Sequence, residues 1–170
     1  MSEVTGPSGG TTAGTAEATG IAGAAGPAGV PTQRVAAYGI ARREGAVLLV
    51  RSSDHSDFPG SWSLPGGGVD HGEHPLDTVV REFHEETGLV VRLSGSPVLL
   101  SDVLEVRDGG VQQHSVRVVV EVEVVGGELT AEQDGTTDVA RWVPAGEAPD
   151  LVLMGFTREA LGLPPGRTVG

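Results

Sequence analysis

The segment from Gly67 to Leu89 constrains the fold more than any other part of the chain. Within it, five residues fall on one face of an α-helix at 100° per residue: Leu76, Val79, Val80, Phe83 and Thr87. Gly88 follows them, at the position where glycine commonly ends helices. The pattern therefore predicts a helix over residues 75–87 that packs this face against the rest of the protein.

Three glutamates of the predicted helix gather on the flank beside the apolar face: Glu82, Glu85 and Glu86. Like charges one turn apart destabilise a helix by roughly 0.2–0.5 kcal/mol, and the helix dipole disfavours anions near a C-terminus. A divalent cation such as Mg²⁺ or Mn²⁺ would offset this repulsion, because hard ions prefer carboxylate oxygens. The alternative is a solvated acidic helix face.

The spacing within the segment is specific. Gly67 is followed after five residues by Glu73, and after seven more by the run REFHEETGL at residues 81–89. This is a complete Nudix box, and the chain resembles the Nudix hydrolase family at every position of that motif. The resemblance extends to WSLPGG at 62–67 and to RWVP at 141–144.

The resemblance implies an α/β Nudix fold, with a mixed β-sheet sandwiched between α-helices. The residue pattern agrees with a turn at Glu44-Gly45, a hairpin turn at Asp108-Gly109 and a break at Gly126-Gly127. Strands are expected over 35–42, 46–50, 90–93, 98–106, 116–125 and 139–143, and a closing helix over 151–161.

We expect three parts in the chain. Residues 1–32 are rich in Gly, Ala and Thr and carry few apolar side chains, which predicts a disordered tail. Residues 33–163 form the Nudix hydrolase domain, and residues 164–170 a flexible C-terminal tail. The first segment lacks the basic start and apolar stretch of a secretory signal, so a cytoplasmic location is expected.

The resemblance assigns roles to the residues of the box. Glu82 and Glu86 are the expected principal ligands of Mg²⁺ or Mn²⁺, and Glu85 completes the set or orients a bound water. The backbone carbonyl of Gly67 is a further expected ligand. Glu73 and Arg81 are expected to pair and to fix the glycine loop onto the helix.

Residues outside the box complete the predicted site. Relatives use either a box glutamate or a carboxylate of a later loop as general base. The later loop offers Glu128, Glu132, Asp134 and Asp138. Of these we select Glu132, with an exposed acidic loop that takes no part in catalysis as the alternative. Two residues are assigned to substrate. Arg51 suits a phosphate contact, with a surface arginine as the alternative. Trp62 suits stacking on a base, with packing of its loop on the core as the alternative. The histidines are expected to be solvated, although His114 could reach substrate.

Composition narrows the chemistry. The chain lacks cysteine, lysine and asparagine, which excludes disulfides, cysteine nucleophiles and a Walker-type lysine. The net charge of −12 disfavours binding to a nucleic acid duplex or to an anionic membrane. The expected partner is a nucleotide-type small molecule. Many relatives form dimers, and valine-rich strand edges would permit a homodimer.

By resemblance, the expected activity is cleavage of a phosphoanhydride bond in a nucleoside diphosphate linked to another group. The tyrosine of dinucleoside polyphosphate hydrolases and the later proline of ADP-ribose hydrolases are missing, which leaves nucleoside triphosphates, oxidised nucleotides and nucleotide sugars. Among these, a nucleoside triphosphate, including oxidised ones, is preferred. Two alternatives stay open. One is a Nudix module that senses nucleotides without cleaving them, and the other is a metal-dependent phosphatase.

Overall fold

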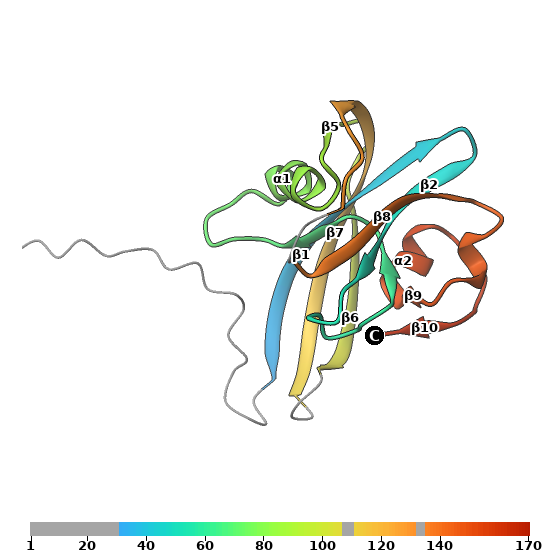
Figure 1. The fold of residues 1–170 in the computed structure, drawn as a ribbon. Helices are drawn as coiled ribbons and strands as arrows, with labels where there is room; N and C mark the ends of the chain where they lie inside the picture. Colours follow the sequence, from blue (N-terminus) through green and yellow to red (C-terminus); the bar gives the residue numbers. More distant parts are fainter. Residues whose placement is uncertain (1–30, 107–110, 132–134) are drawn as a thin grey trace, which may run out of the picture.

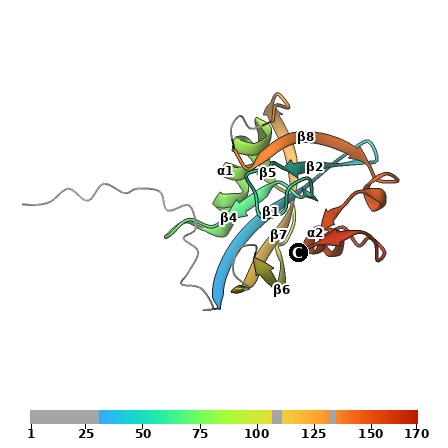
Figure 2. The same ribbon diagram turned by 60° about the horizontal axis from the view of Figure 1, so that its bottom comes forward.

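The computed structural model describes residues 31–106, 111–131 and 135–170. In these residues the strands form one mixed sheet, with α1 and α2 on opposite sides of it (Figure 1, Figure 2). The strands are β1 Thr32–Arg43, β2 Ala46–Ser52, β3 Trp62–Ser63, β4 Gly66–Gly68, β5 Leu89–Leu93, β6 Val98–Val106, β7 Val111–Gly127, β8 Thr137–Pro144, β9 Leu153–Met154 and β10 Thr168–Val169. The helices are α1 Pro75–Thr87, α2 Gly155–Ala160 and a 3₁₀ turn at Ala148–Asp150.

Strands β1 and β7 form the centre of the sheet. They run parallel over ten residue pairs, from Thr32 opposite Gln113 to Ala41 opposite Val122. β1 also pairs antiparallel with the short strand β4 and with β2. β7 takes β6 along its first part and β5 along its last part, both antiparallel. The mixed sheet and the helices on both sides confirm the expected fold class.

Alternation along β1 and β2 gives the sheet two apolar faces. Tyr38 and Leu49 point to one side, where they pack with Phe156 of α2. Ala37 and Leu48 point to the other, where they pack with Phe83 of α1. Successive strand residues face opposite ways, so each helix covers one face.

Helix α1 has the bounds predicted from its sequence. The His74 side chain accepts a hydrogen bond from the Leu76 N–H at the N-terminus, and Pro75 takes the first turn, where it needs no donor. Gly88 ends the helix in the left-handed conformation, at φ 68°. The two ends of α1 are therefore fixed, and the sequence spacing of the box determines where its glutamates lie on the helix.

The buried face of α1 is rotated from its predicted position. Val80 is 37% exposed, whereas Thr78 is fully buried and Glu86 is only 7% exposed. The helix turns its glutamate side inward, toward β4, because only glycines stand there and leave room for carboxylates. The flank expected beside the core is thus part of the buried side.

Other boundaries differ from the predicted ones. The closing helix expected over 151–161 is shorter, because Leu153 pairs with Trp62 in a strand before α2 begins. Strand β7 includes Gly126 and Gly127, which pair with β5. Residues 164–170, expected as a flexible tail, contain β10, which pairs with β9. The predicted turn at Asp108-Gly109 lies outside the described residues.

No helix in the described part of the chain is long and apolar enough to cross a membrane.

Candidate functional site

The glycines of β4 lie against the carboxylates of α1. A Cβ atom added at Gly67 would stand 2.6 Å from Oε1 of Glu82, so only glycine leaves room for that carboxylate. At Gly66, where φ is 145°, a Cβ would stand 2.2 Å from the backbone oxygen of Ala37. The glycine pair is required twice, once by the β1–β4 contact and once by Glu82.

Glu86 is the most enclosed of the three glutamates, with 7% of its surface exposed. Its Oε2 accepts a hydrogen bond of 2.9 Å from the Gly66 N–H, and its Oε1 accepts one of 2.7 Å from the Thr137 hydroxyl. These bonds fix one carboxylate between α1, β4 and β8. Because Thr137 lies 51 residues further along the chain, this contact depends on the whole sheet.

Glu73 and Arg81 tie the loop before α1 to the helix. Arg81 donates to both oxygens of Glu73, at 2.8 and 3.0 Å, and to the carbonyl of Gly68 at 3.3 Å. Glu73 also accepts from the Asp70 N–H at 3.1 Å and from the Thr78 hydroxyl at 2.6 Å. The Arg81 hydrogen bonds lower the pKa of the Glu73 carboxyl to about 2.

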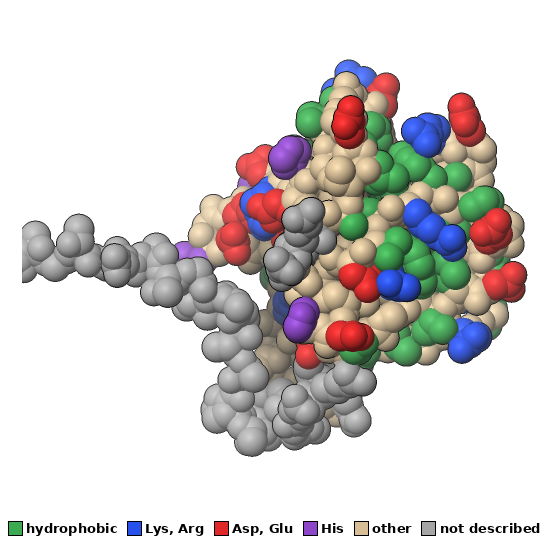
Figure 3. Space-filling model, in the orientation of Figure 1, with side chains coloured by type: hydrophobic (Ala, Val, Ile, Leu, Met, Phe, Trp, Pro, Cys, Tyr) green, Lys and Arg blue, Asp and Glu red, His purple; other side chains and the backbone are tan. Residues whose placement is uncertain are grey.

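The same arginine spans the other two glutamates. Nη1 of Arg81 lies 3.0 Å from Oε1 of Glu82 and 3.0 Å from Oε2 of Glu85. Burial raises the pKa of the Glu82 carboxyl, and the charge of Arg81 offsets part of that rise. Figure 3 shows acidic side chains gathered over α1, with a basic group among them.

The donor chemistry of this cluster fits a divalent cation, since carboxylates and a glycine carbonyl are hard oxygen ligands. In this structure the carboxylates of the cluster are hydrogen-bonded to other groups of the protein. No group of three or more His, Asp or Glu side chains within residues 31–106, 111–131 and 135–170 is already placed to hold a metal ion. An ion bound by Glu82 and Glu85 would share these carboxylates with Arg81, whose Nη1 contacts one oxygen of each.

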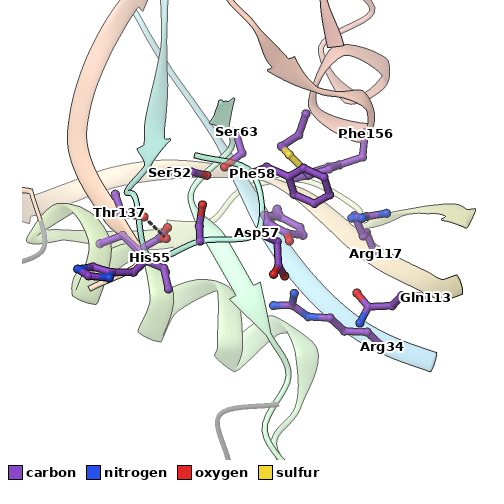
Figure 4. Close-up of a pocket in the computed structure, with 15 residues that line it drawn as sticks. Arg34, Ser52, His55, Asp57, Phe58, Ser63, Gln113, Arg117, Thr137 and Phe156 are labelled. Atoms are coloured by element: carbon purple, nitrogen blue, oxygen red, sulfur yellow. Dashed lines mark hydrogen bonds between the residues drawn. The ribbon is translucent and has the colours of Figure 1, made fainter. Parts of the chain in front are cut away.

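A cavity of about 420 Å³ opens beside Glu86. Figure 4 shows its walls, with a dashed line at Thr137 marking the bond to Glu86. The lining side chains come from strands β1, β2, β3, β7, β8 and β9, from α1 and α2, and from the loop between β2 and β3. They include Arg34, Tyr38, His55, Asp57, Phe58, Gln113, Arg117, Met154 and Phe156. The cavity thus joins a carboxylate at one side to arginines and aromatic rings at the other.

The two residues assigned to substrate from sequence are engaged with other side chains. Arg51 donates to both oxygens of Asp138, at 2.8 and 2.9 Å. Trp62 is half-buried and packs on the core, with the guanidinium of Arg141 5.0 Å from its ring centre. Neither is among the residues that line the cavity. Glu132, the selected general base, lies outside the described residues.

The structure brings forward two arginines that sequence reasoning passed over, Arg34 and Arg117. Arg117 is 4% exposed, forms an ion pair with Asp102, and lies 4.6 Å from the ring centre of Phe156. A lone arginine among the valines of β7 is a signal that could have been noticed. What the sequence does not give is the parallel pairing of β1 with β7, which places both arginines on one face.

The histidines divide between the cavity and the surface. His55 lines the cavity. His114 is outside the cavity lining and lies 2.9 Å from the hydroxyl of Ser101 and 3.2 Å from the amide of Gln33. His71 and His84 are exposed, and His74 caps α1.

The sequence and the fold were compared with those of known proteins. The model of the NUDIX domain matches residues 30–161. An ADP-ribose pyrophosphatase from Methanocaldococcus jannaschii is 36% identical over 100 residues, which are 59% of this chain and 56% of that protein. The chain therefore spans little more than half the length of this relative. The nucleoside triphosphatase NudI from Escherichia fergusonii is 30% identical over 137 residues, 77% of this chain and 96% of that protein.

A solved structure has the same fold. The MutT NUDIX hydrolase from Burkholderia pseudomallei superposes with a TM-score of 0.57 at 24% sequence identity. The match covers 79% of this chain and 99% of that protein.

Proposed function

Because the chain belongs to the NUDIX domain family, we propose that it is a divalent-metal-dependent pyrophosphohydrolase acting on a nucleoside diphosphate linked to another group. The observation that carries the proposal is the position of Glu86. Its carboxylate is held at the edge of the cavity by Gly66 and Thr137, on the same side of α1 as Glu82.

The proposed ligands of Mg²⁺ or Mn²⁺ are Glu82, Glu85, Glu86 and the carbonyl of Gly67. A bound divalent ion would neutralise phosphate oxygens and lower the pKa of an attacking water. The chain's own residues supply the placement. Thr137 and the Gly66 N–H orient Glu86, and Gly67 admits the carboxylate of Glu82.

Arg81 and Glu73 also help to position the glutamates, because they link the loop before α1 to the helix. The bidentate pair keeps the loop of residues 68–74 against α1. We propose that Arg81 also keeps the charges of Glu82 and Glu85 compatible before the ion binds. Glu132 stays a prediction as the general base, and Arg51 and Trp62 stay predictions as substrate contacts.

For the substrate we propose a nucleoside triphosphate, including oxidised ones. The relative aligned over 96% of its length is a nucleoside triphosphatase, which supports this choice. ADP-ribose is the second candidate, supported by the archaeal relative of 36% identity. A nucleotide sensor without turnover is the alternative outside enzymes.

One experiment tests the proposal. The protein is incubated with nucleoside triphosphates, 8-oxo-dGTP, nucleotide sugars and ADP-ribose, with and without Mg²⁺, and every phosphorus-containing product is identified. We expect a nucleoside monophosphate plus pyrophosphate or a phosphorylated partner, only with metal. Turnover should be lost in Glu82→Gln and Glu86→Gln and kept in Glu159→Gln, an exposed glutamate of α2.

The products separate the alternatives. Release of orthophosphate alone would indicate a phosphatase. Binding without any turnover would indicate a sensor, and the catalytic assignments would then be wrong.

A further inference from the structure

The cavity contains one exposed cationic side chain at its rim, Arg34 of β1. The other arginines near the site form ion pairs with carboxylates. Arg117 pairs with Asp102, Arg51 with Asp138, and Arg81 with the glutamates of the box. Within the described residues, the guanidinium of Arg34 forms no hydrogen bond or ion pair at contact distance, and its charge acts over a longer distance on the carboxylate of Glu82.

Arg34 stands next to the acidic cluster. Its side chain crosses the backbone of β4, where a Cβ atom added at Gly68 would lie 3.3 Å from its Nη2. Gly68 directly follows Gly67, against which the carboxylate of Glu82 lies. The cation is therefore one residue of β4 away from the proposed metal ligands.

The sheet directs this side chain into the cavity. Residues two apart in a strand share a face, so Arg34 lies on the same face as Tyr38, which lines the cavity. The parallel register puts Gln113 and Arg117 of β7 on that face as well. Figure 4 shows the guanidinium of Arg34 inside the cavity, directed toward the side where Thr137 lies.

Resting on the proposed function, we propose that Arg34 binds the phosphate chain of the nucleotide beside the carboxylates of α1. A guanidinium presents a planar fork of donors that matches two phosphate oxygens. In a chain of net charge −12, a guanidinium that lines the cavity and forms no ion pair within the described residues is the feature that attracts a polyanion, although Asp57 and Glu86 line the same cavity. The base and sugar are then left to the aromatic side of the cavity, at Phe58 and Phe156.

The test compares Arg34→Gln with Arg42→Gln. Both remove one positive charge from an exposed position of β1, but Arg42 lies outside the cavity and pairs with Glu121. Two quantities are measured. One is KM and kcat for the triphosphate turned over fastest, and the other is the dissociation constant of its α,β-methylene analogue in Mg²⁺.

We expect Arg34→Gln to raise KM and the dissociation constant by about tenfold to a hundredfold, as loss of a hydrogen bond to a charged group would. Affinity for the uncharged nucleoside should not change. Arg42→Gln should behave as wild type. Arg34→Lys, which keeps the charge but loses the fork, should fall between them.

Equal constants for Arg34→Gln and Arg42→Gln would overturn the inference, and so would an equal loss of nucleoside affinity. The proposed function can fail separately. If the wild type binds the analogue but cleaves nothing, while Arg34→Gln binds it more weakly, the phosphate contact stands and the hydrolase does not. A wild type that binds no nucleotide would overturn both.

Discussion

At the scale of single residues, the carboxylate of Glu73 has a structural role, because it holds the loop before α1 against the helix through Arg81. Its pKa of about 2 lies below the ordinary 4.5 because the folded state favours its charged form. The resulting stability is complete above about pH 4.5 and is lost as the pH falls toward 2.

We therefore expect Glu73→Gln to lower the free energy of unfolding by about 1–2 kcal/mol at pH 7. The variant should also lose less stability than the wild type between pH 4.5 and 2.5. Urea unfolding at several pH values measures both. Glu159→Gln, on the exposed side of α2, is the control. Parallel pH curves for Glu73→Gln and the wild type would contradict the ion pair.

Gly66 and Gly67 are neighbours with different structural roles, and substitution of each by alanine should distinguish these roles. Gly66→Ala meets backbone at 2.2 Å in a left-handed conformation, so we expect a stability loss above about 2 kcal/mol. Gly67→Ala meets only the end of the Glu82 side chain. That carboxylate can move, so activity should fall by about a hundredfold while stability changes little.

Thermal unfolding and steady-state rates of the two variants, with Gly146→Ala as control, check this division. Gly146 has no heavy atom within 4 Å of an added Cβ. A Gly67→Ala protein with full activity would show that the position of Glu82 is unimportant.

At the scale of elements, the end of α1 is the clearest junction. A Cβ atom at Gly88 would lie 2.5 Å from the carbonyl oxygen of Glu128. A residue with a side chain at this position would also have to adopt φ near 68°. Gly162, after α2, has a similar φ of 64° but open space around it. We expect Gly162→Ala to cost about 1 kcal/mol of unfolding free energy and Gly88→Ala about 2–3 kcal/mol. Chemical denaturation measures both, and equal costs would show that contact with the loop after β7 is unimportant.

The elements also show what sequence patterns can predict. Helix α1 and strand β6 have the predicted bounds because local spacing and capping determine them. The segment at Leu153 was predicted wrongly as helix, because pairing with Trp62 outweighs its local preference. Arg34 was passed over for the same reason, since its place in the cavity depends on β7.

At the scale of the whole molecule, charge decides how a nucleotide can bind. A protein of charge −12 repels a triphosphate, and Arg34 offsets only part of this repulsion. We expect nucleotide affinity to fall by at least about a hundredfold in excess chelator and to return with Mg²⁺. Isothermal titration calorimetry with the α,β-methylene analogue measures it, and the uncharged nucleoside is the control. Tight nucleotide binding in chelator would contradict the metal-dependent site.

The parallel pairing of β1 with β7 has a consequence for how the protein folds. It joins residues far apart in the chain, such as Gln33 and His114, whereas α1 forms from neighbours. Contacts between distant residues carry a large loop-closure cost and form late. A refolding chain should gain helix α1 early and the cavity between β1 and β7 last. During refolding, amide hydrogens of α1 should therefore become protected from exchange before those that join β1 to β7.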